Sequence, residues 1–76
     1  MTTTEKLGRF LREKRKGQGY SQRALAIQAG IPQRTISEYE RGVRDPRFLQ
    51  AIELALLLDV SLDEMSEAAG MVPAWG

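Results

Sequence analysis

The apolar residues of this chain recur at intervals of three and four positions, and no stretch of any length alternates apolar and polar residues as a strand would. The first stripe, Leu7, Phe10 and Leu11, already shows the helical interval. The pattern therefore predicts an all-α protein. Turn and capping residues divide the chain into five helices, with the approximate bounds 4–16, 22–28, 32–40, 46–58 and 62–69.

Residues that favour helix ends support these bounds. Ser, Thr and Asp side chains accept hydrogen bonds from the first N–H groups of a helix, and proline fits its first position. Glu64 follows Ser61 at the spacing of a capping box, and Asp59 can adopt the left-handed conformation that ends a helix. The expected caps are Thr3 or Thr4 for the first helix, Ser21 for the second, Asp45 before Pro46 for the fourth and Ser61 for the fifth.

The stretch 21–42 has the spacing of two short helices that cross at a sharp angle. Ala26 is small enough for the helices to approach closely, Gly30 allows the positive φ of the turn, and Ile36 fills the gap between them. Such a helix-turn-helix places its second helix in the major groove of DNA. Ile36 and Tyr39 are three positions apart, so both are expected to face inward.

The outward side chains of the helix at 32–40 suit contacts with DNA. Gln pairs with adenine, Arg with guanine, and Glu accepts a hydrogen bond from cytosine N4. Single residues of these types are more often solvated surface, but their placement on one face favours DNA. We predict that four of them contact base edges: Gln33, Arg34, Ser37 and Glu38. Six residues at helix ends or in the following loop are predicted to bind phosphates: Gln22, Arg23, Thr35, Arg41, Arg44 and Arg47.

The net charge of +1 conceals a marked asymmetry. All 11 Lys and Arg residues lie within residues 1–47, where five acids leave a net charge of +6. From Phe48 onward there are five acids and no base, which gives −5. A basic half is typical of a chain that faces a polyanion, although two solvated surfaces of different charge would give the same counts. Together with the helix-turn-helix pattern, the asymmetry favours nucleic acid.

Several motifs together resemble the lambda repressor and Cro type of helix-turn-helix domain, also called XRE-like: LREKR at 11–15, SQRALA at 21–26, AGIPQRTISEYERG at 29–42 and LDVSLDEM at 58–65. The resemblance covers about 7–69 and implies a five-helix bundle that binds operator DNA as a two-fold dimer. By position it assigns two of the residues above, Gln22 and Arg41, to phosphates, and three, Gln33, Arg34 and Glu38, to bases. It also implies a buried ion pair between Arg15 and Glu40, which explains an anion in the unfavourable last turn of a helix. The chain departs from the family at Lys14, usually apolar, and at Asp59, often glycine.

The helix predicted at 46–58 is unusually rich in leucine, and a single bundle cannot cover a helix that is apolar almost all round. Either the chain's own tail or a second subunit covers it. We expect a homodimer through the C-terminal region, with packing of Trp75 on its own core as the open alternative. The candidate interface residues are Leu56, Leu57, Leu62, Met65, Met71, Val72 and Trp75.

The sequence thus predicts one DNA-binding domain at 1–70 and a short apolar tail at 71–76. We expect a cytoplasmic, prokaryotic or phage transcriptional regulator, a repressor rather than an activator, which acts as a homodimer on a palindromic operator. The chain has no Cys or His, so we expect no enzymatic activity, cofactor or metal site. No apolar run approaches the ~18 residues of a membrane span. The alternative is an antitoxin-like or adaptor module whose acidic, apolar half binds a protein partner.

Overall fold

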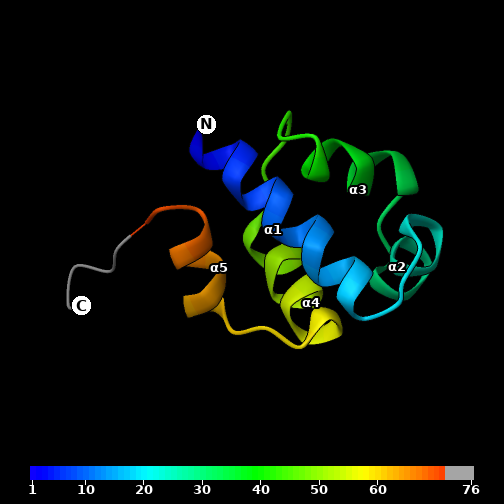
Figure 1. Ribbon diagram of the computed structural model, residues 1–76. Helices are drawn as coiled ribbons and strands as arrows, with labels where there is room; N and C mark the ends of the chain where they lie inside the picture. Colours follow the sequence, from blue (N-terminus) through cyan, green and yellow to red (C-terminus); the bar gives the residue numbers. More distant parts are fainter. Residues whose placement is uncertain (72–76) are drawn as a thin grey trace.

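Five α-helices pack around one core in the computed structural model, which describes residues 1–71 (Figure 1). They are α1 (Thr3–Gly17), α2 (Gln22–Ala29), α3 (Gln33–Glu40), α4 (Phe48–Leu58) and α5 (Leu62–Ala68). The helix-turn-helix of α2 and α3 lies on one side of α1 and α4, and α5 packs against both of them on the other side (Figure 1). The expected all-α fold is confirmed for this part of the chain. None of its helices is long and apolar enough to cross a membrane.

Thr2, rather than Thr3 or Thr4, caps α1, so this helix begins one residue earlier than predicted. The Thr2 hydroxyl accepts a hydrogen bond from the Glu5 N–H at 3.1 Å, and the Glu5 carboxylate accepts one from the Thr2 N–H at 2.9 Å. Three consecutive threonines could each cap a helix, but only Thr2 has a glutamate three residues later to complete the box.

The predicted start of α4 is also wrong. The helix begins at Phe48, two residues after Pro46, and its N-cap Arg47 makes no side-chain capping hydrogen bond. Pro46 lies half-buried at the edge of an apolar groove that Leu7 and Phe48 also line. Packing of the proline ring therefore outweighs the local preference of an Asp-Pro pair for a helix start. Pro32, which is exposed, is also the N-cap of its helix, α3, rather than the first helical residue.

The other predicted ends agree with the structure. The Ser21 hydroxyl accepts a hydrogen bond from the Ala24 N–H at 3.0 Å, and Gly30 ends α2 with φ of 66°. Asp59 ends α4 in the left-handed conformation with φ of 57°. The capping box between Ser61 and Glu64 is present at the start of α5.

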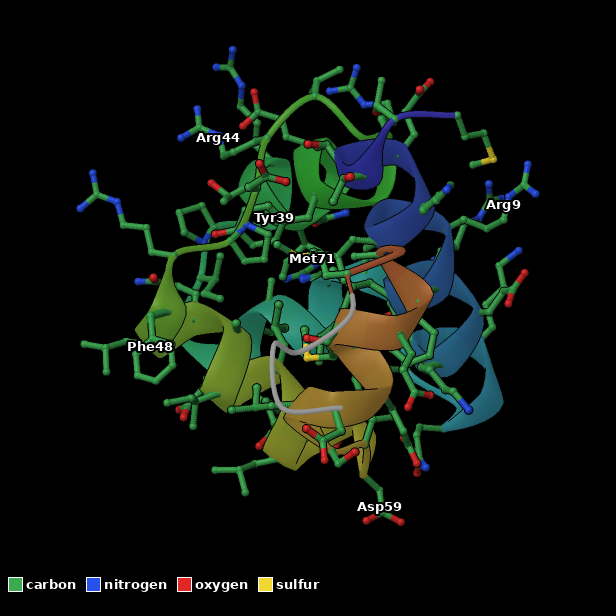
Figure 2. All side chains as sticks on the ribbon, turned by 90° about the vertical axis from the view of Figure 1, so that its left-hand side faces the viewer. Arg9, Tyr39, Arg44, Phe48, Asp59 and Met71 are labelled. Atoms are coloured by element: carbon green, nitrogen blue, oxygen red, sulfur yellow. The ribbon has the colours of Figure 1, made fainter. Side chains whose placement is uncertain are left out.

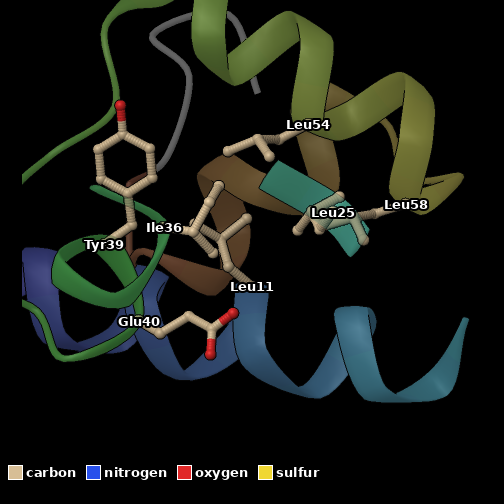
Figure 3. A pocket seen from close by; sticks show the side chains of 7 residues that line it. All are labelled: Leu11, Leu25, Ile36, Tyr39, Glu40, Leu54 and Leu58. Atoms are coloured by element: carbon tan, nitrogen blue, oxygen red, sulfur yellow. The ribbon is translucent and has the colours of Figure 1, made fainter. Parts of the chain in front are cut away.

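The core is formed by one face of each helix. Ile36 is 1% exposed and Tyr39 5%, so both face inward as predicted, whereas Ile27 on α2 is 68% exposed. Side chains from the first four helices converge on a narrow space in which Glu40 stands at the edge nearest α1 (Figure 3). The buried hydrophobic residues are Leu11, Leu25, Ala26, Ile31, Ile36, Tyr39, Leu54, Ala55, Leu58, Met65 and Ala69.

Two glycines let α1 approach the C-terminal end of α3 backbone to backbone. A Cβ on Gly8 would collide with the Tyr39 carbonyl oxygen and lie 2.8 Å from the Glu40 carbonyl oxygen. A Cβ on Gly42 would lie 2.7 Å from the Glu5 Cα, and its φ of 75° favours glycine as well. These contacts fix the position of α3 on the bundle.

Candidate nucleic-acid interface

A buried ion pair joins α1 to the last turn of α3. Arg15 is 8% exposed, and its Nε lies 2.6 Å from Glu40 Oε2 while its Nη2 donates to Glu40 Oε1 at 3.0 Å. The third nitrogen, Nη1, donates to the Tyr20 carbonyl oxygen at 2.9 Å. The guanidinium therefore connects α1, the α1–α2 connection and α3, and the carboxylate of Glu40 is occupied by protein groups rather than exposed to DNA.

Gln22 extends this network to the start of α2. Its Nε2 donates a hydrogen bond to Glu40 Oε1 at 3.1 Å, and the side chain is half-buried. The sequence predicts a phosphate contact for Gln22 but gives no hint of this partner. Because Glu40 holds the amide nitrogen, the side chain keeps one orientation at the helix N-terminus, where N–H groups and the dipole favour anions.

The outward-facing side chains of α3 become less exposed to solvent after its first two residues. Gln33 and Arg34 in the first turn are exposed, whereas Thr35, Ser37 and Glu38 are half-buried. The N-cap Pro32 makes no side-chain hydrogen bond with this turn. The first turn is therefore the part of α3 that stands furthest out. The other arginines predicted to bind phosphates are also exposed: Arg23, Arg41, Arg44 and Arg47.

Glu38 forms an ion pair that sequence reasoning missed. Its Oε1 lies 3.2 Å from Nε of Arg44 in the α3–α4 connection, and the two side chains are 18% and 57% exposed. Arg44 points outward on the side of this connection, well apart from Arg9 of α1 (Figure 2). A predicted base-reading residue and a predicted phosphate-binding residue are thus in contact.

The buried Tyr39 phenol is surrounded by the same charges. Burial raises the pKa of Tyr39 above its ordinary value, the nearby cations of Arg44 and Arg47 act in the opposite direction, and the carboxylate of Glu38 reinforces the rise. Tyr39 is 5% exposed. Its ring therefore anchors the end of α3 in the core directly beneath the charged residues of the connection.

The residues proposed for a dimer interface separate into two groups. Leu56, Leu62 and Met71 are 74%, 45% and 58% exposed, whereas Met65 is 5% exposed and belongs to the core. Leu57 is partly buried against the core, and Val72 and Trp75 lie outside the described residues. The structure adds two apolar residues at the start of α4: Phe48, which points away from the bundle in Figure 2, and Leu49, with exposed fractions of 71% and 74%.

The surface around α3 carries groups that are suited to binding. Within residues 1–71, no three or more acidic side chains come together in a way that could hold a metal ion. Amide, guanidinium and hydroxyl groups dominate the surface around α3, and these are the groups that contact bases and phosphates in protein–DNA complexes.

Comparisons with known proteins all identify a helix-turn-helix protein. A helix-turn-helix family model matches residues 11–65. The chain is 34% identical over 67 residues to the HTH-type transcriptional regulator SlrR and 39% identical over 57 residues to ImmR, both from Bacillus subtilis. These matches cover 87% and 75% of this chain but only 44% and 45% of those proteins, so it spans less than half of their length.

A solved structure resembles nearly the whole fold. The restriction-modification controller protein C.AhdI from Aeromonas hydrophila superposes with a TM-score of 0.77 at 34% identity. The match covers 82% of this chain and 94% of that one. Sequence, family model and fold agree, and the chain belongs to the XRE-like helix-turn-helix family.

Proposed function

We propose that this chain binds double-stranded DNA at specific sequences and acts as a transcriptional repressor, with α3 in the major groove. The observation that carries this proposal is the division of α3 into two faces. Ile36 and Tyr39 fix its inner face in the core, while Gln33 and Arg34 stand exposed at its N-terminal end. The N-terminal residues of a recognition helix are those that reach base edges. The names of the similar Bacillus subtilis proteins support a regulatory role.

The charges of α3 are better suited to DNA than to the isolated helix. Arg34 lies in the first turn, where the helix dipole disfavours a cation by ~0.3–1 kcal/mol. A guanidinium at this place can donate two hydrogen bonds to guanine O6 and N7. In this proposal the base edges meet Gln33, Arg34, Ser37 and Glu38. The phosphates meet Gln22, Arg23, Thr35, Arg41, Arg44 and Arg47.

The proposal includes a homodimer on a palindromic operator, in the cytoplasm of a prokaryote. One helix of eight residues contacts few base pairs, whereas two helices that read half-sites about 34–36 Å apart reach useful specificity. The exposed apolar residues of α4 and α5 offer a surface for the second copy. They are Phe48, Leu49, Leu56, Leu62 and Met71.

Selection of bound sequences from random DNA tests the proposal. We expect a palindromic consensus, and Arg34→Ala should then cost about 1–3 kcal/mol on the operator and relax the preference at one base pair. Arg41→Ala should weaken all sequences alike and lower the slope of affinity against salt. Failure to enrich any sequence, or wild-type binding by both variants, would remove the proposal.

A second candidate function is the capture of a protein partner, in the manner of an antitoxin or adaptor. It is favoured by the exposed apolar residues of α4 and α5, which lie in the half of the chain that carries five acids and no base. Sedimentation separates the candidates: self-association at micromolar concentration supports the homodimer, and a monomer that enriches no DNA sequence supports a partner of another kind.

A further inference from the structure

The ion pair between Glu38 and Arg44 joins two residues with different predicted tasks. We propose that Arg44 is a positioning residue for base reading: by holding one carboxylate oxygen of Glu38, it aims the other at a base edge and keeps Glu38 away from Arg34. This inference rests on the proposed function and assigns Arg44 a part in specificity, in addition to any phosphate contact.

The backbone brings Arg44 to Glu38. After α3, the Gly42 N–H donates to the Tyr39 carbonyl oxygen and the Val43 N–H donates to the Glu38 carbonyl oxygen, both at 3.1 Å. With Gly42 at φ of 75°, these bonds form a Schellman motif that reverses the chain. A Cβ at Gly42 would also collide with Glu5. The return of the chain past α3 is therefore built into the backbone and does not depend on the ion pair.

Glu38 forms its salt bridge with Arg44 and not with Arg34, which leaves Arg34 available to DNA. Arg34 lies four residues before Glu38, at a spacing where side chains of a helix meet, so the two could pair. In the described residues, the salt bridge of Glu38 is instead with Arg44. Arg34 stays exposed and its guanidinium remains available to a base.

Stability does not explain the pair, because an ion pair with a solvent-exposed guanidinium contributes little to folding. Arg44 is 57% exposed at its side chain, so the guanidinium retains N–H groups that face solvent. Glu38 is only 18% exposed, and the direction of that small exposed part decides what the carboxylate meets. With Oε1 beside Arg44, Oε2 is left to accept a hydrogen bond from cytosine N4, whereas thymine would present an acceptor, O4, to it.

The test measures how well the protein discriminates between cytosine and thymine at one position, rather than its affinity for DNA alone. Selection with the wild-type protein and with Glu38→Gln identifies the base pair whose preference depends on Glu38. Affinities are then measured on the operator and on a version with cytosine replaced by thymine at that position. For the wild-type protein we expect the affinity for the operator to be about tenfold higher than for the thymine version, a ratio within the usual cost of one mismatch.

Arg44→Ala and Arg44→Lys should each reduce this ratio by at least about threefold, because neither side chain can hold the carboxylate through Nε. Arg44→Lys keeps the charge, so it should retain more of the total affinity than Arg44→Ala. In the double variant with Glu38→Gln, loss of Arg44 should change the ratio no further, since the group that it positions is gone. Arg47→Ala is the matched control: it removes the same charge from the same connection and should weaken both DNAs equally.

Circular dichroism at the binding temperature checks that each variant is folded. If Arg44→Ala lowers affinity for both DNAs equally, or if Glu38→Gln alters no base preference, the inference is wrong and the proposed function stands. If the wild-type protein selects no sequence at all, the proposed function fails and the inference fails with it.

Discussion

Removal of the Glu40 carboxylate is the most direct test of how α3 is held. In Glu40→Ala, Arg15 loses its contacts of 2.6 and 3.0 Å to the carboxylate and keeps only the bond to the Tyr20 carbonyl oxygen. The Gln22 amide loses its partner as well. Because the Arg15 side chain is 9% exposed, water cannot readily replace these contacts, and a charge remains buried without its counter-ion.

Breaking a buried pair by removing one partner costs ~3–5 kcal/mol. A chain of 76 residues has a stability of roughly 4–11 kcal/mol at the usual value per residue, so the substitution should remove about a quarter of it or more. Urea unfolding followed by far-UV circular dichroism measures the loss as a lower midpoint at an unchanged slope. In contrast, replacing both partners by methionine should restore most of the stability, because well-packed apolar residues can substitute for a buried pair.

Glu38→Ala serves as the control for this experiment. It removes the same type of side chain from the same helix, but its partner Arg44 is 57% exposed, so the pair should be worth only ~0–1 kcal/mol. If Glu40→Ala costs less than about 1 kcal/mol, or no more than Glu38→Ala, then the buried pair does not hold α3.

Three further predictions concern packing, the backbone and titration. Gly8→Ala should lower stability by ~1–3 kcal/mol, seen as a lower melting temperature, because the added Cβ meets the backbone of α3. The control is Gly17→Ala, whose Cβ meets nothing within 4 Å, so it should be neutral or stabilising. Equal effects of the two substitutions would contradict the packing argument. Asp59→Gly should stabilise the folded protein and Asp59→Ala should destabilise it, each by about 1 kcal/mol, because φ is 57° at this position. Urea unfolding midpoints that move in the opposite directions would exclude backbone strain at Asp59. Burial raises the pKa of Tyr39, so as the pH rises past the unfolded value of about 10 the unfolded chain ionises first and stability falls. This alkaline loss should be smaller in Tyr39→Phe, and an unchanged pH profile of the unfolding free energy would show that Tyr39 does not cause it.

Local patterns in the sequence predict most of the fold. The Ser21 cap, the positive φ of Gly30 and the left-handed Asp59 each depend on a residue's own backbone preference, and each appears where expected. The inward placement of Ile36 and Tyr39 follows from helical spacing alone. Features of this kind can be read from a few neighbouring residues.

Features that depend on residues distant in the sequence were missed or misplaced. Pro46 lies in a groove with Leu7 of α1, which no local pattern around the Asp-Pro pair indicates. Met65 is predicted to belong to a dimer interface, but it is buried in the core. The close approach at Gly8 likewise depends on where α1 crosses α3.

For the candidate site, sequence reasoning predicts which side chains lie near α3 but not which of them contact each other. Gln22 is placed at the start of α2 as expected, yet its bond to Glu40 joins residues 18 positions apart. The Glu38–Arg44 pair depends on the chain reversal after Gly42, which a glycine at the helix end could have indicated. The general chemistry of the surface is therefore readable from sequence, while its internal pairing needs the tertiary structure.

The shortness of α3 has a consequence for hydrogen exchange. A helix of eight residues is far below the ~12–15 residues that are marginally stable alone in water, so α3 owes its order to the contacts of Ile36 and Tyr39 with the core. Its central amides should therefore exchange with deuterated solvent only when the whole bundle opens, at the slow rate of the core helices. Any ligand that binds α3 should then slow exchange throughout the core, because the surface that meets the ligand and the interior unfold as one unit.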